Sequence, residues 1–196
     1  MGGIVALGTM LIGFGLSAPA QAAYTLTIQP SMAGVTATGA GSIDFDALAF
    51  FGDELDQSLI APGEGAVIIG PPTPTDDTYY SGIMGPAIAF GTGDELLADM
   101  GGGDVVGLGT LNQTSGGVVA VPQDYVSGAI LATSTATWSG TTITSLGLTP
   151  GNYVWSWGEG ATADSFTIDI IANGVPGAPE PATWAMMLLE IGRAHV

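Results

Sequence analysis

The sequence lacks cysteine and has almost no basic side chains. Its 18 acidic residues stand against one arginine and one histidine, and lysine is absent. Without cysteine there are no disulfides, no thiolate nucleophile and no zinc–sulfur site. The formal net charge of −17 gives a surface that repels phosphate groups, so we expect no nucleic-acid partner. Such acidity favours solubility and attracts cations.

The composition predicts strands and turns. Hydrophobic residues make up 46% of the chain, which is enough for a core, and 32 glycines and 12 prolines are scattered among short apolar runs. This pattern favours many short strands joined by tight turns over long helices. A length of 196 residues is typical of one domain. We therefore predict an all-β fold, a β-sandwich or jelly-roll-like domain, over residues 23–174.

The N-terminus has the pattern of an export leader. Residues 4–16 form an apolar, glycine-rich run that is too short to span a bilayer. Ala20 and Ala22 then supply the small residues of an A-x-A cleavage site, so we predict a helical signal peptide over residues 1–22, cleaved before Ala23. Leaders begin with a basic residue and this one does not, so we expect the natural start to lie upstream. A buried segment at the start of a domain is the alternative interpretation.

Alternating and short apolar runs predict the strands of the domain. We expect strands at residues 24–28, 42–48, 66–69, 118–121, 125–132 and 134–138. Residues 94–100 predict a helix of at most two turns. The acidic cluster at 53–56 and the proline-rich segment at 71–77 predict loops.

The clearest local signal is a hairpin near the C-terminal end of the domain. Pro150 and Gly151 fit the central positions of a type II turn that leads into the first strand, at residues 153–158. A turn at residues 158–161 connects it to the returning strand at 164–171. The aromatic side chains of the first strand recur at period two and share one face: Tyr153, Trp155 and Trp157. They could form a platform for stacking sugar rings, but no cluster of Asn, Gln or Arg flanks them to bind hydroxyls. Filling a sandwich core is therefore the favoured interpretation.

Acidic pairs raise the question of calcium. Asp44 and Asp46 alternate with Ile43 and Phe45, so both carboxylates would lie on one face of a strand. Calcium is bound by such oxygens, but the wet face of a strand is the simpler explanation. We predict no metal site and no cofactor.

Four stretches, at residues 121–128, 137–138, 146–158 and 163–166, carry a family resemblance. They are similar to an exported bacterial domain found ahead of PEP-CTERM sorting tails. In that domain a Tyr-x-Ser-Gly element precedes a Leu-Thr-Pro-Gly-x-Tyr-x-Trp-x-Trp-Gly hairpin. The resemblance implies export, and it implies no particular chemistry for the domain.

The C-terminal region resembles the start of such a tail. Residues 175–189 contain the motif Pro179, Glu180 and Pro181, followed by an apolar run that begins a helix. The resemblance implies transient anchoring in the inner membrane and recognition of the motif by an exosortase, a membrane enzyme similar to a cysteine transpeptidase. Signal peptidase and an exosortase would then be the processing partners, and the domain would reach the cell surface or the extracellular space.

The tail departs from this pattern after Leu189. A complete tail would continue to about 20 apolar residues and end in arginines. Residues 190–196 instead read Glu-Ile-Gly-Arg-Ala-His-Val, the translation of GAG ATC GGA AGA GCA CAC GTC, which resembles a sequencing-library adapter. We interpret them as an artefact that truncates the helix; a natural amphipathic end is the alternative. Arg193 and His195 therefore enter no functional argument.

These absences together predict a protein that is not an enzyme. Catalytic triads, Schiff bases, imidazole-bound metals and arginine clamps all need residues that the chain lacks. A pair of carboxylates, as in glycosidases, remains available, but no pair stands out. We predict a non-enzymatic exported protein of the cell surface or exopolysaccharide matrix. The alternative is a carbohydrate-binding module that uses Tyr153, Trp155 and Trp157.

Overall fold

The computed structural model describes residues 23–86, 89–110 and 116–172. This part of the chain is almost entirely β, as predicted, with one short 3-10 turn, η1 (Gly160–Thr162). It contains no helix long and apolar enough to cross a membrane. The strands are β1 (Tyr24–Pro30), β2 (Gly34–Gly41), β3 (Ala49–Asp56), β4 (Leu59–Ala61), β5 (Ala66–Ile69), β6 (Thr75–Met84), β7 (Leu96–Leu97), β8 (Met100–Gly102), β9 (Val106–Thr110), β10 (Gly116–Pro122), β11 (Ser134–Ser139), β12 (Gly151–Trp157) and β13 (Asp164–Ile170).

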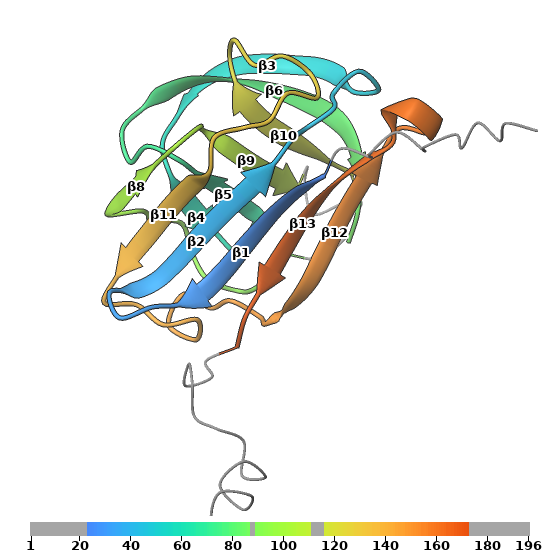
Figure 1. Ribbon diagram of the computed structural model, residues 1–196. Coiled ribbons are helices and arrows are strands. Elements are labelled where there is room, and N and C mark those ends of the chain that lie inside the picture. Colours follow the sequence, from blue (N-terminus) through green and yellow to red (C-terminus); the bar gives the residue numbers. More distant parts are fainter. Residues whose placement is uncertain (1–22, 87–88, 111–115, 173–196) are drawn as a thin grey trace, which may run out of the picture.

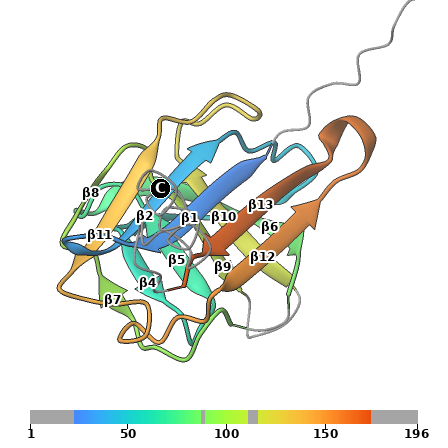
Figure 2. The same cartoon turned by 60° about the horizontal axis from the view of Figure 1, so that its bottom comes forward.

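The strands form one curled mixed sheet with a sandwich-like shape. Their order is β7-β4-β5-β9-β10-β6-β12-β13-β1-β2-β11-β8, and β3 pairs with β6 off this path. In Figures 1 and 2, β11, β2, β1, β13 and β12 lie side by side as one layer, and β4, β5, β9, β10 and β6 form the other. The two ends of the sheet meet, because the indole N–H of Trp138 on β11 donates to the carbonyl of Leu96 on β7 at 3.0 Å.

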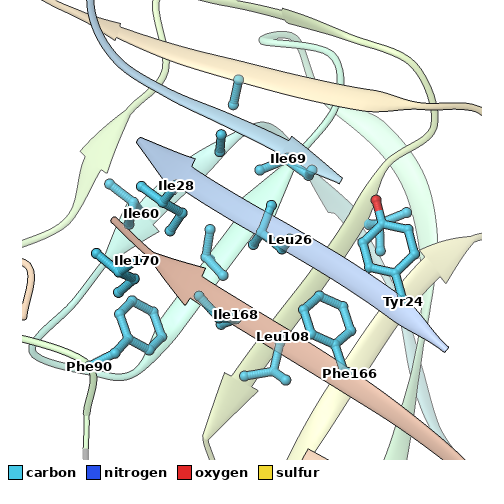
Figure 3. Packing of buried hydrophobic residues seen from close by; sticks show 14 of the residues in the cluster. Tyr24, Leu26, Ile28, Ile60, Ile69, Phe90, Leu108, Phe166, Ile168 and Ile170 are labelled. Carbon is cyan, nitrogen blue, oxygen red and sulfur yellow. The ribbon is translucent and has the colours of Figure 1, made fainter. Parts of the chain in front are cut away.

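The core lies between the two layers. β13 alternates strictly between buried and half-buried residues, and β1 places Tyr24, Leu26 and Ile28 inward at 0–1% exposure. Figure 3 shows Phe166, Ile168 and Ile170 of β13 beside these residues, with Ile69 and Leu108 contributed by the opposite layer. Such alternation is what a sheet with one dry and one wet face requires.

β1 and β13 are parallel neighbours, in register from Tyr24 opposite Phe166 to Ile28 opposite Ile170. The start of β1 and the end of β13 therefore lie at opposite ends of the sheet (Figure 1). The chain enters and leaves the domain at opposite ends.

Several sequence predictions are confirmed by these strands. The expected strands at 24–28, 66–69, 118–121 and 134–138 correspond to β1, β5, β10 and β11. The hairpin is β12 and β13, antiparallel with Trp155 opposite Phe166. The predicted type II turn at Pro150 and Gly151, which leads into β12, differs: Gly151 has a φ of 158° and already belongs to β12, and Gly147 has a φ of 65°.

Other predictions were wrong, and tertiary pairing explains why. The expected helix at 94–100 is instead β7 and β8, which pair with β4 and β11, strands that are remote in sequence. The expected loop at 53–56 is the second half of β3, paired with β6. The expected strands at 42–48 and 125–132 are irregular segments joined by a single bridge, Ser42 to Ile130. The predicted leader helix and the tail from 175 onward lie outside the described residues.

Candidate functional site at the acidic edge

The aromatic row of β12 belongs to the core and is not a binding platform. Trp155 is fully buried and Trp157 is 5% exposed, so neither ring presents a face to solvent. Tyr153 is half-buried, packs against the core and lies edge-on to Phe90 at 6.1 Å between ring centroids. Its hydroxyl donates to the Thr149 carbonyl at 3.0 Å. The three residues therefore cannot stack together on a sugar, which corrects the platform interpretation.

The residues of the family resemblance converge on the segment around Asp44. The Tyr125 hydroxyl accepts from the Ile43 N–H at 2.9 Å, and the Ser127 hydroxyl accepts from the Phe45 N–H at 3.0 Å. The Trp157 indole donates to the Asp44 carbonyl at 2.6 Å. Hydrogen bonds to main-chain groups replace the strand pairing that this segment lacks.

The carboxylates of this segment are also engaged. Asp44 accepts from the Ser127 hydroxyl at 3.1 Å and from the Asp46 N–H at 2.9 Å. Asp164 accepts from the Asp44 N–H at 2.6 Å, and burial raises the pKa of Asp164 despite that bond. No group of three or more acidic or histidine side chains in the described ranges could hold a metal ion. The calcium alternative at Asp44 and Asp46 thus has no supporting geometry among these residues, and the hydrogen bonds of its carboxylate give Asp44 a structural role.

A different feature of the fold has no such structural explanation. β3 pairs with β6 along one edge, and no hydrogen bond between its other edge and the rest of the described chain is found. Figure 1 shows β3 at the outer margin of the sheet, beyond β6. Its large apolar side chains are exposed: Phe50 by 63%, Phe51 by 58% and Leu55 by 61%. We call β3 and the facing residues 75–81 of β6 the acidic edge.

The register gives the acidic edge two distinct faces. Phe50 lies opposite Tyr80 and Leu55 opposite Asp76, so both share the face that continues the core. Phe50 contacts Tyr80 edge-on, with ring centroids 6.4 Å apart. On this face Asp53 accepts a hydrogen bond from the Thr78 hydroxyl at 2.7 Å. A register shift between Phe50 and Gly52 leaves Phe51 as a bulge.

The opposite face carries Glu54 and Asp56 without an apolar residue between them, whereas the first face combines Asp53 and Asp76 with Phe50 and Leu55. Glu54 lies directly opposite Asp77, and Asp56 accepts from the Tyr79 hydroxyl at 2.7 Å. Burial and, to a smaller extent, the neighbouring carboxylates raise the pKa of Tyr79. The bond to Asp56 therefore keeps Tyr79 protonated as a donor. No arginine, lysine or histidine lies in the described parts of the chain to offset these carboxylates.

Asp77 is the most unusual residue of this face. It has 0% exposure, and neither carboxylate oxygen has a hydrogen-bond partner among the described residues. Burial raises its pKa to about 7, and the negative charges of Asp56 and Glu54 add to the shift. A buried carboxylate without a partner is unfavourable in its charged form. Asp77 therefore keeps its proton to a higher pH than an ordinary aspartate, and it adds little negative charge to this face below neutral pH.

The remaining predicted site residues belong to processing. Ala20, Ala22, Pro179, Glu180 and Pro181 lie outside the described residues. Ala23 is exposed, and its carbonyl accepts from the Ser42 N–H at 3.2 Å immediately before β1 begins.

No family model, no curated protein and no solved structure matched the chain. The candidate site therefore rests on the geometry of the acidic edge alone. Sequence reasoning missed it because 53–56 was interpreted as a loop. One signal was present: two adjacent phenylalanines precede a run rich in acid, which is unusual for a solvated loop.

Proposed function

We propose that this chain is a non-enzymatic exported protein of the cell surface or exopolysaccharide matrix. Signal peptidase removes residues 1–22, and an exosortase acts at Pro179, Glu180 and Pro181 after transient anchoring in the inner membrane. The domain between these signals is what reaches the outside. The sequence supplies the two processing signals, and the geometry of the acidic residues supports a domain that is not an enzyme.

The observation that carries the proposal is the position of β1 relative to the predicted cleavage site. β1 starts at Tyr24, one residue after the predicted cleavage point, and the Tyr24 ring is completely buried. Cleavage before Ala23 would leave all the inward residues of β1 in the mature chain. An exposed Ala23 is also a chemically suitable new N-terminus. A boundary that coincides with an A-x-A site supports the interpretation of residues 1–22 as a leader.

The non-enzymatic part of the proposal is supported by the roles found for the acidic residues. Asp44 and Asp164 hold main-chain groups in place, and Asp77 has no exposed surface with which to contact a substrate. The exposed acids of β3 lie on an open strand edge. Binding suits such a surface better than catalysis, which needs a water-excluding site.

The leader is tested by expressing the full gene in a bacterium that carries an exosortase, then measuring the intact mass of the released protein. We expect a mature N-terminus at Ala23. Ala22→Leu should block cleavage because the peptidase accepts only a small residue there, whereas Gln21→Leu, at the tolerant position between the two alanines, should be processed normally. Equal processing of both variants would contradict the leader.

The tail is tested in the same host by replacing Pro179, Glu180 and Pro181 with alanine. We expect the variant to stay with the membrane fraction while the parent reaches the surface or the medium. Ala178→Ser is the matched control beside the motif. If the motif variant were processed and released like its parent, sorting at this motif would be refuted, and the leader result would stand independently.

A further inference from the structure

The free edge of β3 can form main-chain hydrogen bonds with an added strand. One edge of β3 is used by β6, and the other has no partner in the described parts of the chain. An exposed strand of this length with unpaired main-chain groups is a template for a further strand. Proteins usually blunt such edges with charges and bulges, and β3 has both.

Protection of the edge against aggregation does not explain the exposed apolar residues of β3. Phe50, Phe51 and Leu55 are each more than half exposed, although a soluble edge strand would be safer with polar residues there. Two of them, Phe50 and Leu55, lie on the face that continues the core. A strand added to β3 could therefore pack its own apolar side chains against Phe50 and Leu55 on this face.

The acids on the other face of β3 determine which charge a partner strand should carry. Glu54 and Asp56 share it with the buried Asp77, and Glu54 lies directly opposite Asp77. Glu54 and Asp56 lie two residues apart on this face without a basic side chain in the described chain, and an opposite charge on an added strand would attract both. A strand added to β3 places every second side chain over this face. Lysine or arginine at those positions would complement the acids.

A second copy of the domain does not fit this requirement. The described residues contain no basic side chain, so another copy would bring only further acid or neutral groups to the edge. Pairing of β3 with a second β3 would place Asp53, Glu54 and Asp56 of two molecules in one sheet. The charge therefore selects against self-association and for a partner of different composition.

We propose that the free edge of β3 binds an extended segment of a cationic polypeptide in which basic and apolar residues alternate, with the apolar residues over Phe50 and Leu55 and the basic residues over Glu54 and Asp56. The segment joins the sheet as an additional strand. This proposal is independent of the export route proposed above.

The test uses the full chain and a dye-labelled synthetic decapeptide of alternating lysine and valine, with binding followed by fluorescence anisotropy. We expect saturable binding that weakens as salt rises from about 0.05 M to 0.5 M, because the charges are exposed. A peptide of the same composition with its lysines and valines in two blocks should bind more weakly. An alternating glutamate–valine peptide should not bind.

Two matched pairs of variants locate the site. Glu54→Gln should weaken binding about twofold to fivefold, as expected for an exposed ion pair, whereas Glu95→Gln changes an equally exposed acid elsewhere and should leave it unaltered. Leu55→Ser should weaken binding by about tenfold through lost apolar burial. Ile130→Ser, at a residue 90% exposed, is its control.

Hydrogen exchange by mass spectrometry supplies the direct readout of strand addition. Bound peptide should slow amide exchange at residues 49–56 more than at any other described segment. Equal binding of the block peptide, protection at another site, or loss of affinity in the control variants would overturn the proposal. Concentration-dependent dimers that Leu55→Ser abolishes would also overturn it, in favour of a second copy as the occupant.

Discussion

Replacing Asp77 by asparagine should make the protein more stable above neutral pH and leave it almost unchanged in acid. Asparagine has the same shape as aspartic acid but carries no charge. Asp77 is completely buried, without a hydrogen-bond partner in the described chain, and its pKa is raised from an ordinary value of 3.8 to about 7. Burial is the main cause, and Asp56, Glu54 and Asp76 add repulsion.

The sign follows from comparing the folded and unfolded states. Below about pH 4 the carboxyl is protonated in both states, so the folded protein carries no penalty from it. As pH rises toward 7, the unfolded chain loses this proton while the folded chain keeps it, and stability falls. Above pH 7 the penalty is constant. Since one pKa unit corresponds to about 1.36 kcal/mol, the shift to about 7 corresponds to at most about 4 kcal/mol.

The assay is urea unfolding of the parent and Asp77→Asn between pH 4 and pH 8. The free energy of unfolding of the variant should exceed that of the parent by up to about 4 kcal/mol at pH 8, and the difference should fall below about 1 kcal/mol at pH 4, close to the ordinary pKa of 3.8. Comparing two proteins cancels the general repulsion of this acidic chain, including the contribution of Asp164. Asp76→Asn, which changes the exposed neighbour on β6, should give a difference of only a few tenths of a kcal/mol. A variant that is less stable at pH 8, or a difference independent of pH, would refute the reasoning.

Three further predictions concern packing and the segment around Asp44. Trp157→Phe keeps an aromatic ring but removes the N–H that donates to the Asp44 carbonyl at 2.6 Å, so the free energy of unfolding should fall by about 1–3 kcal/mol. Ser127→Ala removes two hydrogen bonds to the same segment and should lower it by about 1–2 kcal/mol. Gly85→Ala would place a methyl group 2.2 Å from Trp155 in the core and should cost about 1–3 kcal/mol or more. Urea unfolding at pH 6 measures all three.

Gly102→Ala and Thr142→Ala are useful comparisons for these variants. A methyl group at Gly102 would meet no atom within 4 Å, so this change should be close to neutral, unlike Gly85→Ala. Thr142 makes its hydrogen bonds within an exposed turn, so its loss should matter less than that of Ser127. If Trp157→Phe and Ser127→Ala were both neutral, the segment around Asp44 would not depend on the bonds described.

The hairpin of β12 and β13 could be predicted because its pattern is local. β13 alternates strictly, β12 alternates from Tyr153 onward, and a short turn connects them, so neighbouring residues determine the pairing. The burial of Trp155 and Trp157 followed from the same alternation.

β3, β7 and β8 could not be predicted, since remote strands create them. The local sequence around Leu96 and Leu97 favours a helix, but these two residues pair with β4. Likewise, Met100 to Gly102 pair with β11. The acids of β3 have low strand propensity, yet pairing with β6 overrides it. The acidic edge was therefore invisible as a surface until the register of β3 was known.

The residues that carry the family resemblance have structural roles that the residues of the acidic edge do not share. Tyr125, Ser127, Trp157 and Asp164 all belong to the resembling stretches, and each bonds a main-chain group between residues 43 and 45. These residues are explained by the need to hold an irregular segment against the core, and they leave no side chain directed at a ligand. On β3, Asp53, Asp56 and Phe50 contact β6, whereas Phe51 and Leu55 remain more than half exposed and Glu54 is exposed. The edge of β3 combines exposed apolar side chains with acids, and the described parts of the chain contain no basic residue to neutralise them, which is why we propose that a strand of opposite charge completes it.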